Sequence, residues 1–145
     1  MKHFISTAIL GTSDGATSIA GVIAGAAGAG VAHSAIAVSA IGGAFAATVS
    51  MSGGELLSES TTDWYAIGSM GAGTLLGSAL PAMPLLFVTG TGSTLAVIGV
   101  DVLIGLLVGY VRARATNTRV IKAQIQSLAI ITAGGLAGLF AGRFL

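Results

Sequence analysis

Five long apolar segments alternate with short polar connections along the chain. They cover about residues 4–27, 34–57, 64–80, 93–111 and 121–144. Each is close to the roughly 20 residues that an α-helix needs to cross the hydrocarbon core of a bilayer. The connections between them are short and contain the glycine, proline and polar residues that are typical of turns. The pattern predicts an all-α protein, a bundle of five transmembrane helices that forms one integral membrane domain over residues 1–145.

Composition agrees with a membrane protein. Hydrophobic residues make up 54% of the chain and charged residues only 8%, whereas about a quarter of the residues of a soluble domain are charged. Six basic and five acidic residues give a net charge of +1. Six basic residues are too few for a surface that binds the phosphate backbone of a nucleic acid, so nucleic acid is not expected as a partner. Because the chain has no cysteine, disulfides and thiolate metal sites are excluded.

The first apolar segment is expected to be a helix of the bundle and not a cleaved signal peptide. Asp14 interrupts it, and it continues to about Ala27, which is too long for the apolar region of a signal peptide.

Lysine and arginine predict the orientation in the membrane. Lys2 precedes the first segment, and four more basic residues surround the last connection: Arg112, Arg114, Arg119 and Lys122. With five crossings these two places lie on the same side, which the positive-inside rule makes cytoplasmic. The connection at residues 58–63 then also faces the cytoplasm, and the C-terminus lies on the opposite side. Trp64 and Tyr65 fall where an interfacial aromatic belt is expected.

Glycines recur at four-residue spacing within the apolar segments. In lipid this spacing permits close approach of helices, so most of these glycines are expected to serve packing only. They are Gly11 and Gly15, Gly21 and Gly25, Gly73 and Gly77, Gly105 and Gly109, and Gly134, Gly138 and Gly142. None forms a phosphate-binding loop, because the glycines at 90 and 92 are not followed by the required lysine.

A thioether and a carboxylate lie one helical turn apart at the end of the second segment. Met51 and Glu55 share one face of the expected helix, because residues four apart stack on each other. Beside them runs a stripe of small residues, a pattern that marks a surface where another helix packs. The stripe consists of Gly42, Ala46, Ser50 and Gly54.

Two acids lie well inside apolar segments, where each costs roughly 2.5 to 3.5 kcal/mol at the bilayer centre. They are Asp14 and Asp101, and every basic residue lies at a segment end or in a connection. The acids are therefore protonated, bonded to hydroxyls such as those of Thr17 and Ser18, or partnered by a mobile cation or proton. A rise of 1.5 Å per residue puts Asp14 roughly 15 Å and Met51 roughly 9 Å from the cytoplasmic ends of their helices.

Asp14, Met51 and Glu55 are candidate metal ligands, with Glu55 nearest the cytoplasmic entrance. Carboxylates with a thioether suit a transition ion such as Fe²⁺ better than Mg²⁺ or Ca²⁺. Three donors are too few for six-coordination, but a two-fold dimer would double the set. Candidate accessory ligands are Glu59, Asp63 and Asp101; His3 and His33, at segment ends, are expected to have no role.

The chain resembles the vacuolar iron transporter family over almost its whole length. The residues that match are Ser13-Asp14-Gly15, the run from Ser50 to Ser58 that contains Met51 and Glu55, the region from Gly77 to Phe87 with Pro81 and Pro84, and the run from Gly109 to Arg114. The second motif is the most specific.

This resemblance implies a homodimer of five-helix protomers that exports Fe²⁺ or Mn²⁺ from the cytoplasm in exchange for protons, with Co²⁺ and Zn²⁺ as further cargo. The metal path would lie at the dimer interface and use Asp14 and Met51, with Glu55 close by; no prosthetic group is implied. The membrane would be the plasma membrane of a prokaryote or a vacuolar-type membrane of a eukaryote.

The chain differs from the family in two places, and both differences remove carboxylates. Only residues 58–63 stand where plant and protozoal members carry a long cytoplasmic insert, and Gly43 and Ala47 stand where members often have an acid. These differences motivate an alternative function, a transport-inactive membrane scaffold with the same bundle. An enzyme is not expected, because no zinc-protease motif and no Ser/His/Asp set at one depth is found.

Overall fold

The computed structural model describes residues 2–58 and 62–144, and nearly all of this part of the chain is helical. The prediction of an all-α fold is confirmed, since no strand occurs in these two ranges. The helices are α1 (Lys2–Gly28), α2 (His33–Ser58), α3 (Trp64–Ala82), α4 (Pro84–Phe87), α5 (Thr91–Thr116) and α6 (Val120–Phe144).

The five predicted segments correspond to the five long helices, and the main differences lie at helix ends. α5 continues five residues beyond the predicted end at residue 111, because Arg and Ala at 112–115 are strong helix formers. It ends at Asn117, whose positive φ of 56° is typical of the residue that follows a helix. The predicted turn at 81–92 contains the end of α3 and all of α4, which begins with Pro84 at a position that tolerates proline.

Four stretches of helix are long and apolar enough to cross a membrane: α2, α3 together with α4, α5 and α6. α1 was also expected to cross but is not among these four. It is a more polar helix, with Thr7, Thr12, Asp14 and Thr17 along its length. Contacts with α2, α3, α5 and α6 shield much of its surface, so α1 needs fewer apolar side chains than a helix that faces lipid.

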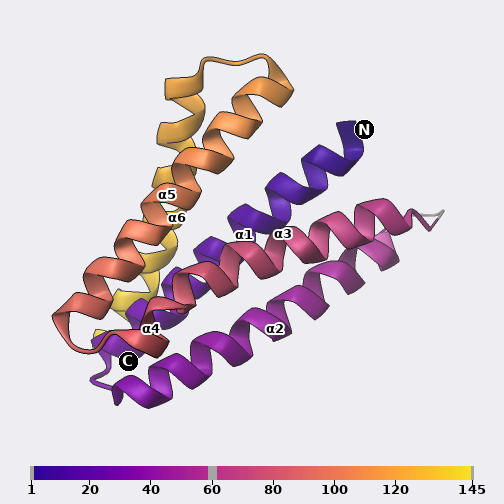
Figure 1. Cartoon of the computed structure of the whole chain (residues 1–145). Coiled ribbons are helices and arrows are strands. Elements are labelled where there is room, and N and C mark those ends of the chain that lie inside the picture. Colours follow the sequence, from indigo (N-terminus) through magenta and orange to yellow (C-terminus); the bar gives the residue numbers. More distant parts are fainter. Residues whose placement is uncertain (1, 59–61, 145) are drawn as a thin grey trace.

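The helices form a fan that is closed at one end (Figure 1). α1, α2 and α3 run side by side, while α5 and α6 form a hairpin that diverges from them. The C-terminus, the α1–α2 connection and α4 meet at the closed end. The start of α1, the end of α2, the start of α3 and the α5–α6 connection lie at the open end, so they are at one end of the bundle, as the sequence predicts.

α1 is held between α3 and α6 by close backbone contacts at glycines. A Cβ atom on Gly73 would lie 2.5 Å from the carbonyl oxygen of Ala8, and one on Gly25 would lie 3.1 Å from that of Gly138. In the hairpin, a Cβ atom on Gly109 would lie 2.5 Å from the Cα atom of Gln124. The prediction that the spaced glycines permit close helix packing is confirmed at these contacts.

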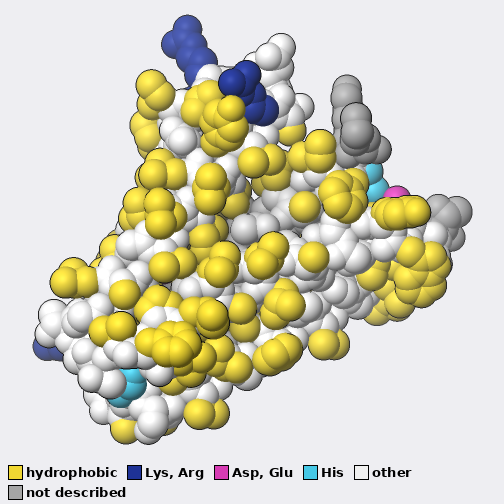
Figure 2. Space-filling model, viewed as in Figure 1, with side chains coloured by type: hydrophobic (Ala, Val, Ile, Leu, Met, Phe, Trp, Pro, Cys, Tyr) yellow, Lys and Arg dark blue, Asp and Glu magenta, His cyan; other side chains and the backbone are white. Residues whose placement is uncertain are grey.

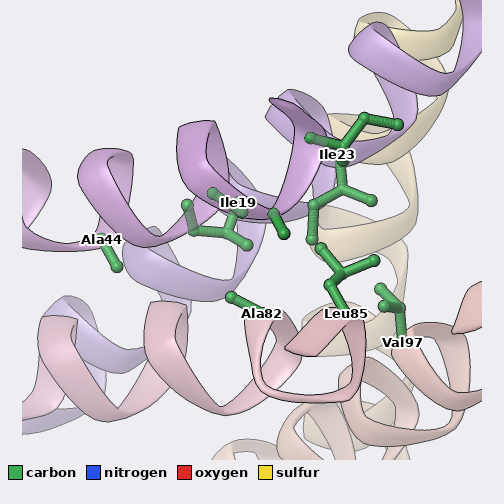
Figure 3. Packing of buried hydrophobic residues seen from close by; sticks show 9 residues of the cluster. Ile19, Ile23, Ala44, Ala82, Leu85 and Val97 are labelled. Carbon is green, nitrogen blue, oxygen red and sulfur yellow. The ribbon is translucent and has the colours of Figure 1, made fainter. Parts of the chain in front are cut away.

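The apolar core at the closed end draws on five helices (Figure 3). Ile19 and Ile23 of α1 point into it. α2 contributes four buried residues, Ile36, Ala37, Ala40 and Ala44, and the other helices contribute one each: Ala82 of α3, Leu85 of α4 and Val97 of α5. His33 fixes the start of α2 here, because its Nε2 atom lies 2.8 Å from the carbonyl oxygen of Leu85.

The surface has the distribution expected of an integral membrane protein. Hydrophobic side chains are spread over the face seen in Figure 2, and most of the lysine and arginine seen there lies at the end where α5 and α6 are connected. Trp64 and Tyr65 are 71% and 80% exposed at the start of α3, next to a polar connection. Aromatic side chains at this position suit the boundary between lipid and water.

Candidate metal site

The carboxylate of Glu55 contacts the imidazole of His3 at the open end of the bundle. Nε2 of His3 lies 3.4 Å from Oε1 of Glu55, and the two side chains are 51% and 10% exposed. Oε1 accepts no hydrogen bond among the described residues, so His3 is a contact of this oxygen but not its hydrogen-bond donor. A nearly buried carboxylate oxygen without a hydrogen bond is costly, and its need for a cation is therefore strong.

The beginning of α1 is fixed in place by a serine–threonine contact with α3. The hydroxyls of Thr7 and Ser69 are hydrogen-bonded to each other, and both side chains are buried. The Thr7 hydroxyl also lies 3.1 Å from the carbonyl oxygen of His3, to which it donates. The backbone of His3 is thus tied through Thr7 to the start of α3.

Met51 lies on the face of α2 that turns toward the rest of the bundle. It is partly buried, and it continues the face of Ala44, which is buried in the core two turns earlier. Thr48 and Ser52, beside it, pack on Gly71 of α3. Met51 and Glu55 therefore lie on a partly buried face of α2, next to residues that contact α3.

Among the described residues, no helix packs on the small-residue stripe beside this face. Its four members are exposed, and a Cβ atom on either of its glycines would meet nothing within 4 Å: Gly42, Ala46, Ser50 and Gly54. The smooth surface that they form is open to a partner.

Asp14 lies on a strip of α1 between two helix contacts. Gly11 packs on α3 and Gly21 on α6, while Leu10 and Ser18, one turn to either side of Asp14, are exposed. Asp14 itself is half-buried. The hydroxyl of Thr17 donates to the carbonyl oxygen of Ser13 at 2.7 Å, so this candidate partner of Asp14 is engaged elsewhere.

The depths of Asp14 and Met51 agree with the estimate from helix rise. A Cβ atom on Gly43 would lie 3.4 Å from Cδ1 of Ile19, which puts these two residues of the antiparallel helices α2 and α1 at one level. Asp14 precedes Ile19 by five residues, and Thr48 follows Gly43 by five, so Asp14 and Thr48 lie at one level of the two antiparallel helices. Met51 lies about one turn beyond Thr48 in α2.

Asp101 lies apart from these residues, in a cleft between α1, α5 and α6. The cleft has a volume of about 400 Å³, and alanines and branched aliphatic side chains of α1, α5 and α6 form most of its walls. Oδ1 of Asp101 is buried and has no hydrogen-bond partner in the described part of the chain. Asp101 is half-buried as a whole and does not join the other candidate ligands.

Asp63 has a structural role at the start of α3. Its Oδ1 atom accepts hydrogen bonds from the backbone N–H groups of Tyr65 and Ala66, at 3.0 and 3.2 Å. This is the geometry of a helix N-cap. Glu59, another candidate accessory ligand, lies outside the described residues.

One protomer does not assemble a complete metal site from its acids and histidines. Among the described residues, no three His, Asp or Glu side chains are close enough together to hold an ion. The arrangement offers a nitrogen and an oxygen at His3 and Glu55, and Met51 lies one turn deeper in α2. The sequence does not predict the contact between His3 and Glu55, because it depends on how α1 packs against α2 and α3.

The comparison with protein families supports the resemblance over the part of the chain that contains its first two motifs. The model of the VIT family, the vacuolar iron transporters, matches residues 5–66. This range covers α1, α2 and the start of α3, and it includes Asp14, Met51 and Glu55. The match is consistent with a family member and, at this coarse level, with transport of metal ions across a membrane. No curated protein and no solved structure matches the chain.

Proposed function

Because residues 5–66 match the VIT family, we propose that this protein exports a divalent transition-metal ion from the cytoplasm in exchange for protons. Fe²⁺ and Mn²⁺ are the proposed cargo, with Co²⁺ and Zn²⁺ as weaker alternatives. The observation that carries the proposal is that the matched range contains all three candidate ligands, two of them on one inward face of α2.

Each ligand has a separate task in this proposal. Glu55 meets the ion at the open end of the bundle, and Asp14 and Met51 bind it deeper in the membrane. Protons from the far side then neutralise the carboxylates, which lose their attraction for the cation and release it. Glu59, Asp63 and Asp101 are accessory candidates that assist capture or proton transfer.

A homodimer completes the site. Three donors from one chain leave a six-coordinate ion short of ligands, and two-fold symmetry supplies the same three again. The exposed stripe of Gly42, Ala46, Ser50 and Gly54 would allow helices of two protomers to approach closely. Asp14, between exposed neighbours on α1, is likewise open to a second protomer.

The proposed orientation puts the open end of the fan in the cytoplasm. The N-terminus and the basic residues around the α5–α6 connection lie at that end, and the positive-inside rule favours the cytoplasm for them. α1 crosses the membrane in this proposal as the fifth span, shielded by its neighbours, and the C-terminus lies on the opposite side.

Uptake of Mn²⁺ and Fe²⁺ into proteoliposomes with an imposed proton gradient tests the proposal. We expect Asp14→Ala to abolish uptake, because Asp14 is the only acid in the sequence of α1. Ser18→Ala, one turn away on the same exposed strip, should transport like the unaltered protein. Uptake that is unchanged in Asp14→Ala would refute the proposed mechanism.

The second candidate function is a transport-inactive scaffold. The observation that favours it is that the described residues of one protomer bring no three acids or histidines together. Titration of the purified protein with Fe²⁺, Mn²⁺ and Co²⁺ separates the two functions, since a scaffold would show no saturable binding.

A further inference from the structure

We propose that His3 is a metal ligand and that, with Glu55, it forms the site where the ion first binds. This inference rests on the proposed transport function and adds to it a residue, a position and a preference among ions. Its starting point is the 3.4 Å separation between Nε2 of His3 and Oε1 of Glu55, two residues at opposite ends of consecutive helices.

The two atoms have the spacing of ligands that share one ion. Imidazole nitrogen and carboxylate oxygen bind first-row ions such as Zn²⁺ at about 2.1 Å, so a 3.4 Å separation corresponds to an angle of about 110° at the ion. This angle is close to the tetrahedral value. An ion can therefore enter between the two side chains with little movement of either.

The position of His3 is built into the fold. The hydroxyl of Thr7 donates to the His3 carbonyl oxygen and is itself bonded to Ser69, which is buried at the start of α3. Without this connection, the first turn of α1 would fray, as helix ends do. The connection orders the backbone turn that carries His3, which lowers the entropy that must be lost when a metal binds.

The exposures of the two side chains define a direction of entry. The His3 side chain is 51% exposed and can meet an ion in solution, whereas that of Glu55 is only 10% exposed. Met51 follows one turn deeper on the same helix. Donor atoms thus follow one another inward as nitrogen, oxygen and sulfur.

This order of donors selects among ions. Ca²⁺ and Mg²⁺ require oxygen ligands, whereas imidazole and thioether favour transition ions. The His3–Glu55 pair therefore discriminates against the abundant alkaline-earth ions at the entrance. A site of carboxylates alone would offer weaker discrimination.

Metal binding to His3→Gln tests the inference, because glutamine keeps a polar side chain but removes the imidazole. We expect the affinity of His3→Gln for Co²⁺ to be at least about tenfold lower than that of the unaltered protein, because the loss of one group that supports a metal site typically lowers affinity at least this much. If His3 only occupies Glu55 as a charge partner, its removal frees the carboxylate, and affinity stays the same or rises. The sign of the change therefore decides between the two roles.

His33→Gln is the matched control, since His33 contacts the carbonyl oxygen of Leu85 at the other end of α2 and should leave affinity unchanged. The electron spin-echo signal of ¹⁴N coupled to bound Mn²⁺ gives a second measurement on the unaltered protein. We expect this signal in the unaltered protein and in His33→Gln, and its absence in His3→Gln. Its absence from the unaltered protein at saturating Mn²⁺ would overturn the inference.

The failure of this inference can be distinguished from failure of the transport proposal. If the protein binds metal and Glu55→Gln weakens binding while His3→Gln does not, only the role of His3 is refuted. If no saturable metal binding is found, the transport proposal and the role of His3 are refuted together.

Discussion

Gly77 of α3 lies directly against the carbonyl oxygen of Thr12 in α1, so closely that a methyl group on Gly77 would overlap this oxygen. The obstructing atom belongs to the backbone and cannot rotate away. Ala8 and Gly73 form the same kind of contact one turn nearer the open end. The distance between α1 and α3 is therefore set by glycine, and α1 carries both His3 and Asp14.

We expect Gly77→Ala to destabilise the protein by about 1–3 kcal/mol, because the added methyl group must push two backbones apart. The measurement is the free energy of unfolding in mixed micelles with increasing denaturing detergent. Gly68→Ala is the matched control in the same helix, since a Cβ atom there meets nothing within 4 Å. Equal stability of the two variants would show that the contact does not limit packing.

The dimer proposed for the metal path should depend on the small-residue stripe of α2. Ala46 is exposed in the middle of this stripe, where a phenyl group would hold a second helix away. We expect Ala46→Phe to shift the purified protein from dimer to monomer in light scattering with detergent correction. Leu107→Phe, at a position of α5 that is 64% exposed and far from α2 in the sequence, should remain dimeric.

We expect the Asp101 side chain to lower the stability of the folded protein. Its Oδ1 atom is buried without a hydrogen bond among the described residues, beside a largely apolar cleft. We expect Asp101→Leu to raise the free energy of unfolding by about 1–3 kcal/mol, the cost of an unsatisfied buried polar group. Asp101→Asn keeps polar atoms in the cleft and should gain little.

A lower stability of Asp101→Leu would contradict this prediction and would mean that the carboxyl group has a partner in the native protein. Such a result would favour the role of Asp101 as an accessory site for a proton or an ion.

Local spacing in the sequence was sufficient to predict much of the fold. Glycines four apart predicted the close contacts of α1 with α3 and α6, and the interval between Met51 and Glu55 predicted their shared face, because both patterns act within one helix. The proximity of His3 to Glu55 could not be predicted in this way. It depends on the register between helices, which the bond between Thr7 and Ser69 helps to fix.

The role of a charged residue near a helix end was likewise ambiguous in the sequence. Asp63 was interpreted as a candidate accessory ligand, yet its carboxylate caps α3. An acid that precedes an apolar run fits both roles, because a helix N-terminus attracts negative charge just as a cation does.

Two substitutions of Asp63 separate these roles. Asp63→Ala removes the acceptor for the N–H groups of Tyr65 and Ala66, and we expect a loss of about 0.5–2 kcal/mol in the free energy of unfolding. Asp63→Asn keeps a side-chain oxygen that caps equally well, so its stability should be unchanged. Because only the carboxylate attracts a cation, the initial rate of metal uptake by Asp63→Asn reports the accessory role alone. A reduced rate at unchanged stability would support that role, and a normal rate would leave capping as the sole function of Asp63.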